Sequence, residues 1–229
     1  MTSHNRHMSA SLAGARSIVL DADSTLCGIE GIDWLATLRP AAVADEIARL
    51  TREAMDGALA LEDVYGARLE AVAPTRAEVE SLAAAYLATI APGAAEFVRA
   101  MQAASARVLI VSGGLRDALL PLARSIGIHD GDVHAVDISF DAAGRYADFD
   151  RASPLTRSRG KATCVRAAEL ARPVVAVGDG STDVEIRSEG ACDSFIAFTG
   201  FVRRAEVVAA ADAECASFGE LHELLRAPR

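Results

Sequence analysis

The sequence has little of what marks membrane, nucleic-acid-binding and disulfide-stabilised proteins. No apolar run among its 229 residues approaches the roughly 20 residues needed to span a bilayer. Its 23 basic residues are outnumbered by 32 acidic ones, so the net charge of −9 gives no attraction to nucleic acid or anionic membranes. The four cysteines are scattered and form no C-x-x-C pair, which disfavours a disulfide scaffold and a zinc ribbon. We therefore expect a cytoplasmic protein that binds neither nucleic acid nor membrane.

The first residues also lack a targeting signal. Residues 1–15 are polar and small and contain no apolar segment like that of a signal peptide. We expect a flexible tail there. The remaining length suits one large domain or a domain that carries a smaller insert, in a protein that is a monomer or a homodimer.

Lysine is almost absent. Lys161 is the only lysine, so 23 − 1 = 22 of the basic residues are arginines. A sequence that uses arginine nearly everywhere suggests that this one position needs a compact ammonium instead of a broad planar guanidinium. Lys161 is therefore a candidate site residue, although a single lysine left by chance is the simpler alternative.

Three short apolar runs, by contrast, are prominent. They cover residues 18–20, 108–111 and 174–177, and each leads directly into a small polar cluster. Continuous apolar runs are typical of strands buried on both faces of a parallel sheet, and the helical patterns between them favour an α/β fold. Because ligands bind outside the carboxyl ends of such strands, we expect the polar clusters to form one site.

The long stretch over residues 28–91 has no strand signal. Its apolar spacing predicts helices, over 32–38, 40–55, 61–72 and 76–90. It is too long for an ordinary connection, so we expect a helical cap over the strand ends. The core is then formed by residues 16–27 and 92–229.

Two further elements are predicted in the second half of the chain. Residues 133–149 alternate apolar and polar side chains around a turn that contains glycine, which indicates an antiparallel hairpin near the sheet edge. Residues 218–225 are predicted to form a closing helix.

The first polar cluster places two carboxylates, Asp21 and Asp23, two residues apart. A divalent cation would relieve their repulsion, and Mg²⁺ prefers oxygen ligands, to which Asp179 in the third cluster could contribute. A carboxylate beside such a cation can attack phosphorus, and a second aspartate that holds a proton can donate it to the leaving group. In isolation, the same D-x-D could equally be a surface turn.

The other clusters add groups suited to an anion. Ser112, Gly113 and Gly114 precede a predicted helix, where backbone N–H groups favour negative charge. Lys161 begins another helix and could neutralise phosphate oxygens. Asp183 could orient Lys161 or a water molecule beside the metal.

A nucleotide-binding P-loop around Gly160 and Lys161 is excluded. The pattern requires a glycine and a Ser or Thr where this sequence has Leu155 and Ala162.

The order of these clusters resembles a known family. The motifs D-A-D-S-T, V-S-G-G, the late lysine and G-D-G-S-T-D resemble the four motifs of the haloacid dehalogenase superfamily. Within it, D-A-D-S-T-L-C-G-I-E-G-I-D-W-L-A and A-M-D-G-A-L-A-L-E-D-V-Y-G-A-R-L are similar to the opening and the cap of the phosphoserine phosphatases. The similarity continues through F-D-A-A-G-R-Y-A-D-F-D and F-I-A-F-T-G and covers nearly the whole chain after the tail.

The resemblance implies a three-layer, Rossmann-like core with a small helical cap after the first strand. It also implies Mg²⁺-dependent hydrolysis of O-phospho-L-serine to L-serine and phosphate, in L-serine biosynthesis, through a phospho-aspartate at Asp21. The implied site consists of the following residues. Asp21 is the nucleophile and Asp23 the acid/base; Asp21, Asp179 and the backbone carbonyl of Asp23 hold the metal; Ser112, Gly113 and Lys161 bind phosphate; Glu30, Met55, Arg68 and Thr182 bind the rest of the substrate, with Glu30 on the ammonium and Arg68 on the carboxylate.

Two residues depart from the family pattern. Leu61 stands where many relatives have phenylalanine, and Thr182 stands where many have asparagine. Both concern the substrate pocket and not the phosphoryl chemistry.

Two alternatives remain at this point. One is a related phosphatase or phosphotransferase that acts on another small phosphate monoester. The other is a non-catalytic sensor phosphorylated on aspartate, which would need neither an acid/base at Asp23 nor a large cap.

Overall fold

The computed structural model, which describes residues 14–56 and 58–226, is built around one parallel sheet. The sheet has six strands in the order β3-β2-β1-β6-β7-β8, and every neighbouring pair is parallel. In chain order the strands are β1 (Ser17–Leu20), β2 (Arg107–Leu115), β3 (Val133–Val136), β6 (Val174–Gly178), β7 (Ser194–Phe198) and β8 (Ala213–Cys215). Every residue of β1 and β6 and residues 108–111 of β2 are buried, which confirms the parallel sheet predicted from three continuous apolar runs. Strand β7, which was not predicted, is fully buried as well. The predicted tail over residues 1–15 lies almost entirely outside the described residues.

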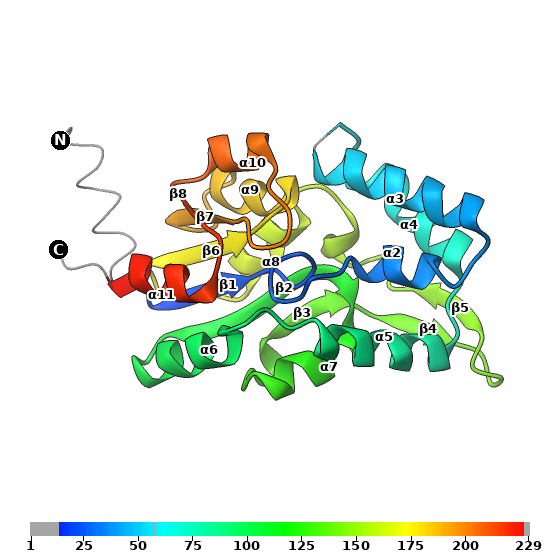
Figure 1. Ribbon diagram of the computed structural model, residues 1–229, viewed down its shortest axis with the longest axis horizontal. Helices are drawn as coiled ribbons and strands as arrows, with labels where there is room; N and C mark the ends of the chain where they lie inside the picture. Colours follow the sequence, from blue (N-terminus) through cyan, green and yellow to red (C-terminus); the bar gives the residue numbers. More distant parts are fainter. Residues whose placement is uncertain (1–13, 57, 227–229) are drawn as a thin grey trace.

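Helices cover both faces of this sheet. Figure 1 shows α9 and α10 on one side of it and α6, α7 and α11 on the other. The helices that come after residue 91 are α6 (Ala94–Ala103), α7 (Arg116–Ser125), α8 (Gly160–Ala167), α9 (Ser181–Ser188), α10 (Ala205–Ala210) and α11 (Phe218–Arg226). Two 3₁₀ turns, η1 (Asp130–Asp132) and η2 (Pro154–Thr156), complete the connections. The three layers agree with the predicted α/β architecture.

Between β1 and α6 the described chain is helical, as predicted. The helices are α2 (Gly31–Ala36), α3 (Ala41–Met55), α4 (Leu61–Val72) and α5 (Arg76–Ala88). They gather at the end of the sheet toward which β1 runs, on the right in Figure 1. The side chain of Thr75 accepts a hydrogen bond from the Glu78 backbone N–H while Glu78 bonds back to Thr75, so a capping box fixes the start of α5.

The predicted hairpin over 133–149 is wrong in its first part. Residues 133–136 form β3, which pairs in parallel with β2 at the edge of the main sheet. Burial of Val133 and Val136 holds this segment against the core. Only the remainder is antiparallel, as a separate two-stranded sheet of β4 (Ile138–Phe140) and β5 (Tyr146–Phe149).

The second polar cluster lies at the end of β2 and directly before α7, as predicted. Ser112, Gly113 and Gly114 belong to the strand itself, which has a register irregularity between Val111 and Leu115. All four cysteines are free thiols. Within the described ranges, no helix combines the length and the apolar character that crossing a membrane requires.

Candidate active site

The three polar clusters converge on one pocket at the carboxyl ends of β1, β2 and β6. Of the predicted site residues, ten line it: Asp21, Asp23, Glu30, Met55, Arg68, Ser112, Gly113, Lys161, Asp179 and Thr182. Asp183 lies beside the pocket and contacts it through Lys161. The core strands thus supply acidic and anion-binding groups, and helices α3 and α4 supply the opposite wall.

Lys161 forms the centre of a buried charge cluster. Its Nζ lies 2.7 Å from Oδ1 of Asp21 and 2.7 Å from Oδ1 of Asp183. Burial alone would lower the pKa of Lys161, but the charges of Asp183 and Asp21 outweigh it and raise the pKa above its ordinary value. The ammonium therefore stays charged and faces the Asp21 carboxylate.

Asp183 is held in place from two sides. Its Oδ2 accepts a hydrogen bond from the Gly180 backbone N–H at 3.1 Å, while its Oδ1 accepts from Lys161. A side chain at Gly178 would come within 2.2 Å of the Asp183 carboxyl carbon, so only glycine lets β6 approach this closely. Burial, followed by the charge of Asp21, raises the pKa of Asp183 to about 7.

Three carboxylates could hold a divalent cation together. Ligand atoms of Asp21, Asp179 and Asp183 all lie within 4.8 Å of one another, and all three residues are buried. Oxygen donors at this spacing fit a hard cation such as Mg²⁺. Asp21 and Asp179 belong to the predicted metal set. The third predicted ligand is the backbone carbonyl of Asp23, whose role stays a prediction, since the Asp23 carboxylate itself binds Tyr86 and Gly31.

The Asp23 carboxyl group is held by two hydrogen-bond donors that do not belong to the cluster of Asp21, Asp179 and Asp183. Tyr86 from α5 donates its hydroxyl to Oδ1 at 2.7 Å, and the Gly31 backbone N–H donates to Oδ2 at 3.1 Å. Burial, followed by the charges of Glu30 and Asp21, raises the pKa of Asp23 from 3.8 to about 8. Asp23 therefore carries a proton near neutral pH, as a general acid must.

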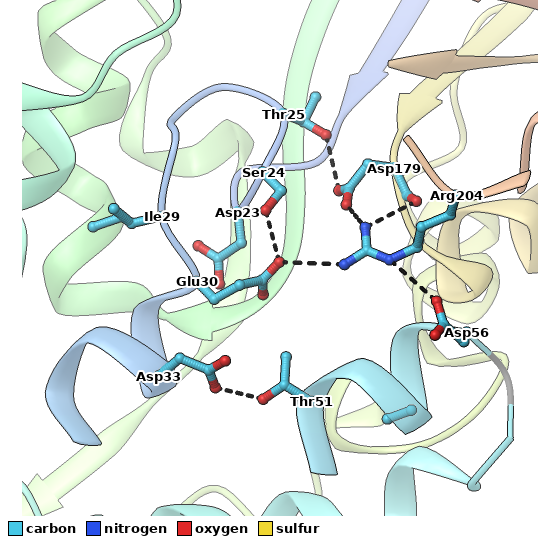
Figure 2. Close-up of polar contacts among 12 residues, drawn as sticks. Asp23, Ser24, Thr25, Ile29, Glu30, Asp33, Thr51, Asp56, Asp179 and Arg204 are labelled. Atoms are coloured by element: carbon cyan, nitrogen blue, oxygen red, sulfur yellow. Dashed lines mark hydrogen bonds and ion pairs between the residues drawn. The ribbon is translucent and has the colours of Figure 1, made fainter. Parts of the chain in front are cut away.

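An arginine that the sequence analysis did not single out lies among these carboxylates. Arg204 donates from Nη1 to the Oδ2 and the backbone carbonyl of Asp179, the latter at 3.2 Å. The same guanidinium lies 3.9 Å from Oε1 of Glu30 and 3.5 Å from Oδ1 of Asp56 (Figure 2). Thr25 donates to the remaining oxygen of Asp179 at 3.2 Å. The Arg204 guanidinium thus connects Asp179, which follows β6, to Glu30 and Asp56.

Glu30 lies next to Arg204 and is also held by a hydrogen bond from Ser24. Ser24 donates its hydroxyl to Oε1 of Glu30 at 2.8 Å (Figure 2). Burial is the main cause that raises the pKa of Glu30. Glu30 lines the pocket, and a cationic group bound there would favour the ionised form of this side chain and offset the effect of burial.

Arg68 provides the opposite charge on the pocket wall. Leu61, Tyr65 and Arg68 line the pocket from positions i, i+4 and i+7 of α4, which share one helix face. The Arg68 side chain is 5% exposed, and its Nη2 lies 3.3 Å from Oδ1 of Asp33. Its Nε is buried and has no hydrogen-bond partner among the described residues. A buried donor of this kind suits an incoming anion.

The remaining predicted residues border the same space. Ser112 is buried and its Oγ accepts from the Gly114 backbone N–H at 3.0 Å, while Tyr65 donates to the Gly113 carbonyl at 2.8 Å. Thr182 lies in the first turn of α9. Next to it, Ser181 donates to the Ala54 carbonyl at 3.0 Å, so the end of α3, which carries Met55, lies against α9.

Asp23 is one of several buried carboxyl groups that make the stability of the protein depend on pH. Because its folded pKa of about 8 lies above the ordinary 3.8, its contribution to stability is complete below the ordinary value and is lost as the pH rises through about 8. We expect the melting temperature of the metal-free protein to fall between about pH 5 and about pH 9, and to fall less in Asp23→Asn. Calorimetry at several pH values measures this. The exposed Asp45→Asn serves as the control and should leave the slope unchanged; an equal slope in Asp23→Asn would contradict the assignment.

Comparisons with known proteins identify the family of the chain. The sequence model of the haloacid dehalogenase-like hydrolase family matches residues 18–186. The chain is 35% identical to a chloroplastic phosphoserine phosphatase of Arabidopsis thaliana, over 86% of this chain and 67% of that protein. It is 34% identical to a phosphoserine phosphatase of Bos taurus, over 90% of this chain and 92% of that protein.

A solved structure shares the fold. A phosphoserine phosphohydrolase-like protein from Francisella tularensis superposes with a TM-score of 0.85 and 24% identity, covering 91% of this chain and 99% of that one. Together with the converging carboxylates, the buried lysine and the family match, this places the chain in the haloacid dehalogenase-like hydrolase family, in the group of the phosphoserine phosphatases.

Proposed function

We propose that the protein is a divalent-metal-dependent phosphatase that hydrolyses O-phospho-L-serine to L-serine and phosphate. The observation that carries the proposal is the charge arrangement of a single pocket. Asp21 and Lys161 lie on its core side, and Glu30 and Arg68 line the same pocket with opposite charges. Phosphoserine has a phosphate, an ammonium and a carboxylate, and each finds a group of opposite charge here.

In this proposal Asp21 is the nucleophile. Its Oδ attacks phosphorus, the bond to the serine oxygen breaks, and the phosphoryl group moves onto Asp21. Asp23, which carries a proton near neutral pH, donates it to the departing serine oxygen. Asp23 then accepts a proton from the water that hydrolyses the acyl phosphate. Lys161, Ser112 and Gly113 bind the phosphate oxygens and stabilise the charge that develops on them.

The carboxylates of Asp21, Asp179 and Asp183 fit a divalent cation, and we propose Mg²⁺ with Asp21 and Asp179 as ligands. When bound, the cation would neutralise phosphate charge and reduce the repulsion between Asp21 and the substrate. Asp183 forms an ion pair with Lys161, so we propose that it mainly orients Lys161.

Recognition of the serine half is assigned to the wall opposite the phosphate site. Glu30 is proposed to bind the ammonium, and Arg68 the carboxylate, through the buried Nε that has no partner among the described residues. Met55 and Thr182 are proposed to complete this part of the pocket, where Leu61 leaves more room than a phenylalanine would.

Residues 28–91 are proposed to act as a cap on a core formed by 16–27 and 92–229. The contacts from Arg204 to Asp56 and from Ser181 to Ala54 join the two parts beside the pocket. We further propose a cytoplasmic monomer or homodimer that serves L-serine biosynthesis.

A panel of phosphate monoesters tests the function. We expect kcat/KM to be highest for phosphoserine, about 100-fold above phosphoethanolamine, which lacks the carboxylate. Equal values for the two would indicate a phosphatase for another small ester. Addition of an alcohol such as ethanolamine distinguishes hydrolysis from phosphotransfer, because transfer would form a new ester in place of free phosphate.

A further inference from the structure

A single carboxylate oxygen joins three helices on the pocket wall. Oδ1 of Asp33, on α2, lies within hydrogen-bond distance of the Thr51 hydroxyl on α3 and of Nη2 of Arg68 on α4. Figure 2 shows the Asp33 and Thr51 side chains pointing toward one another. We propose that Asp33 and Thr51 are positioning residues, which hold the Arg68 guanidinium where the carboxylate of the substrate binds.

Arg68 needs such support because little else fixes its charged end. The guanidinium is buried, and Asp33 is the one ion-pair partner found for it among the described residues. Nε lies without a partner within the same part of the chain. A long side chain held by one contact at 3.3 Å would sample other rotamers, and an arginine binds a carboxylate well only when its planar fork is correctly oriented.

Asp33 is in turn fixed by Thr51. Thr51 is 2% exposed, and its β-branched side chain has few rotamers within a helix. Its hydroxyl oxygen lies near Asp33 Oδ1 and also 3.0 Å from the Ile47 carbonyl one turn earlier. One hydroxyl hydrogen cannot serve both acceptors, and the charged carboxylate is the stronger of the two. Thr51 therefore sets the rotamer of Asp33, and Asp33 sets that of Arg68.

A different role for Asp33 is direct binding of the substrate ammonium. The geometry favours positioning, because Oδ1 of Asp33 already serves both Thr51 and Arg68, whereas Glu30 meets a single hydroxyl from Ser24 and the more distant Arg204. The two roles can be distinguished with substrates that lack either the carboxylate or the ammonium of phosphoserine. Positioning of Arg68 matters only for substrates with the carboxylate, whereas direct binding matters only for those with the ammonium.

The inference rests on the proposed function and concerns its specificity. If Asp33 and Thr51 hold Arg68, they favour phosphate monoesters that carry a carboxylate. They should contribute nothing to monoesters that have only an ammonium or neither group.

The test compares Thr51→Val with Thr51→Ser. Valine keeps the shape of threonine and removes the hydroxyl, whereas serine keeps the hydroxyl. We expect Thr51→Val to raise KM for phosphoserine about tenfold with little change in kcat, and to change kcat/KM for phosphoethanolamine by less than about twofold. Thr51→Ser should restore most of the phosphoserine KM. Melting temperatures of both variants show that the fold is intact.

A second variant, Asp33→Asn, separates positioning from ammonium binding. Asparagine keeps an oxygen that can accept from Thr51 and Arg68 but removes the charge. Positioning predicts that the variant keeps the wild-type ratio of kcat/KM for phosphoserine over phosphoethanolamine. It also predicts an unchanged ratio of phosphoserine over 3-phosphoglycerate, which has a carboxylate and no ammonium. A loss confined to phosphoserine and phosphoethanolamine would overturn the proposal, as would an unchanged phosphoserine KM in Thr51→Val. Wild-type protein that does not prefer phosphoserine over phosphoethanolamine would instead refute the proposed function itself.

Discussion

Asp21→Asn is expected to abolish turnover, lowering kcat for any phosphate monoester by at least about 10⁴-fold. Asparagine has nearly the same shape, so the loss would come from the missing nucleophile and not from an altered pocket. The change also removes one of the two carboxylates that contact Lys161, while the pair between Lys161 and Asp183 at 2.7 Å remains. Release of inorganic phosphate from p-nitrophenyl phosphate and from phosphoserine measures the effect.

Asp45→Asn on the exposed surface of α3 is the matched control and should leave kcat unchanged. A rapid-quench experiment on wild-type protein adds a direct readout, because radiolabelled phosphate from the substrate should appear on the protein and be absent from Asp21→Asn. A loss of kcat much smaller than about 10⁴-fold in Asp21→Asn would contradict the role of Asp21 as the nucleophile.

Arg68→Gln is expected to lower kcat/KM for phosphoserine about 100-fold, mainly through KM. The guanidinium is the cation of the pocket wall whose Nε has no partner among the described residues, so its loss leaves the substrate carboxylate unpaired in a buried site. Phosphoethanolamine should be affected less than about threefold, since it has no carboxylate. Steady-state kinetics on the two substrates gives the ratio.

The control for Arg68 is Arg49→Gln, which removes an arginine of α3 that pairs with Glu46 and Glu53 on the surface. It should change neither substrate's kinetics. Equal losses for phosphoserine and phosphoethanolamine in Arg68→Gln would mean that Arg68 supports the pocket generally and does not bind the carboxylate.

The sequence predicts the sheet well where its physical signal is strong. Strands β1 and β6 and the central part of β2, residues 108–111, contain continuous apolar runs that are buried, and the helices of residues 28–91 have clear apolar spacing. The prediction omits β7 and β8. The run over 194–198 is mostly apolar and is buried like the predicted strands but was not recognised, and the three residues of β8 carry no recognisable periodicity. It misassigns β3, since a four-residue edge strand alternates like a hairpin strand and only the pairing with β2 distinguishes them.

The site is predictable where residues follow strand ends and unpredictable where distant segments meet. Topology brings Asp21, Ser112 and Asp179 together, because parallel strands end at one edge of the sheet. No sequence pattern marks Arg204, which reaches Asp179 from the start of α10, or Tyr86, which reaches Asp23 from α5. These two contacts depend on how the helices pack.

Lys161 and Arg204 form ion pairs with the carboxylates of the candidate metal site, and this has a practical consequence. They act as counterions that the polypeptide itself supplies to Asp21, Asp183 and Asp179. A protein with such internal neutralisation should remain folded after treatment with a chelator, unlike domains whose folding depends on their metal. Dialysis alone should then suffice to exchange Mg²⁺ for Mn²⁺ or Co²⁺, which would open the site to magnetic and optical spectroscopy.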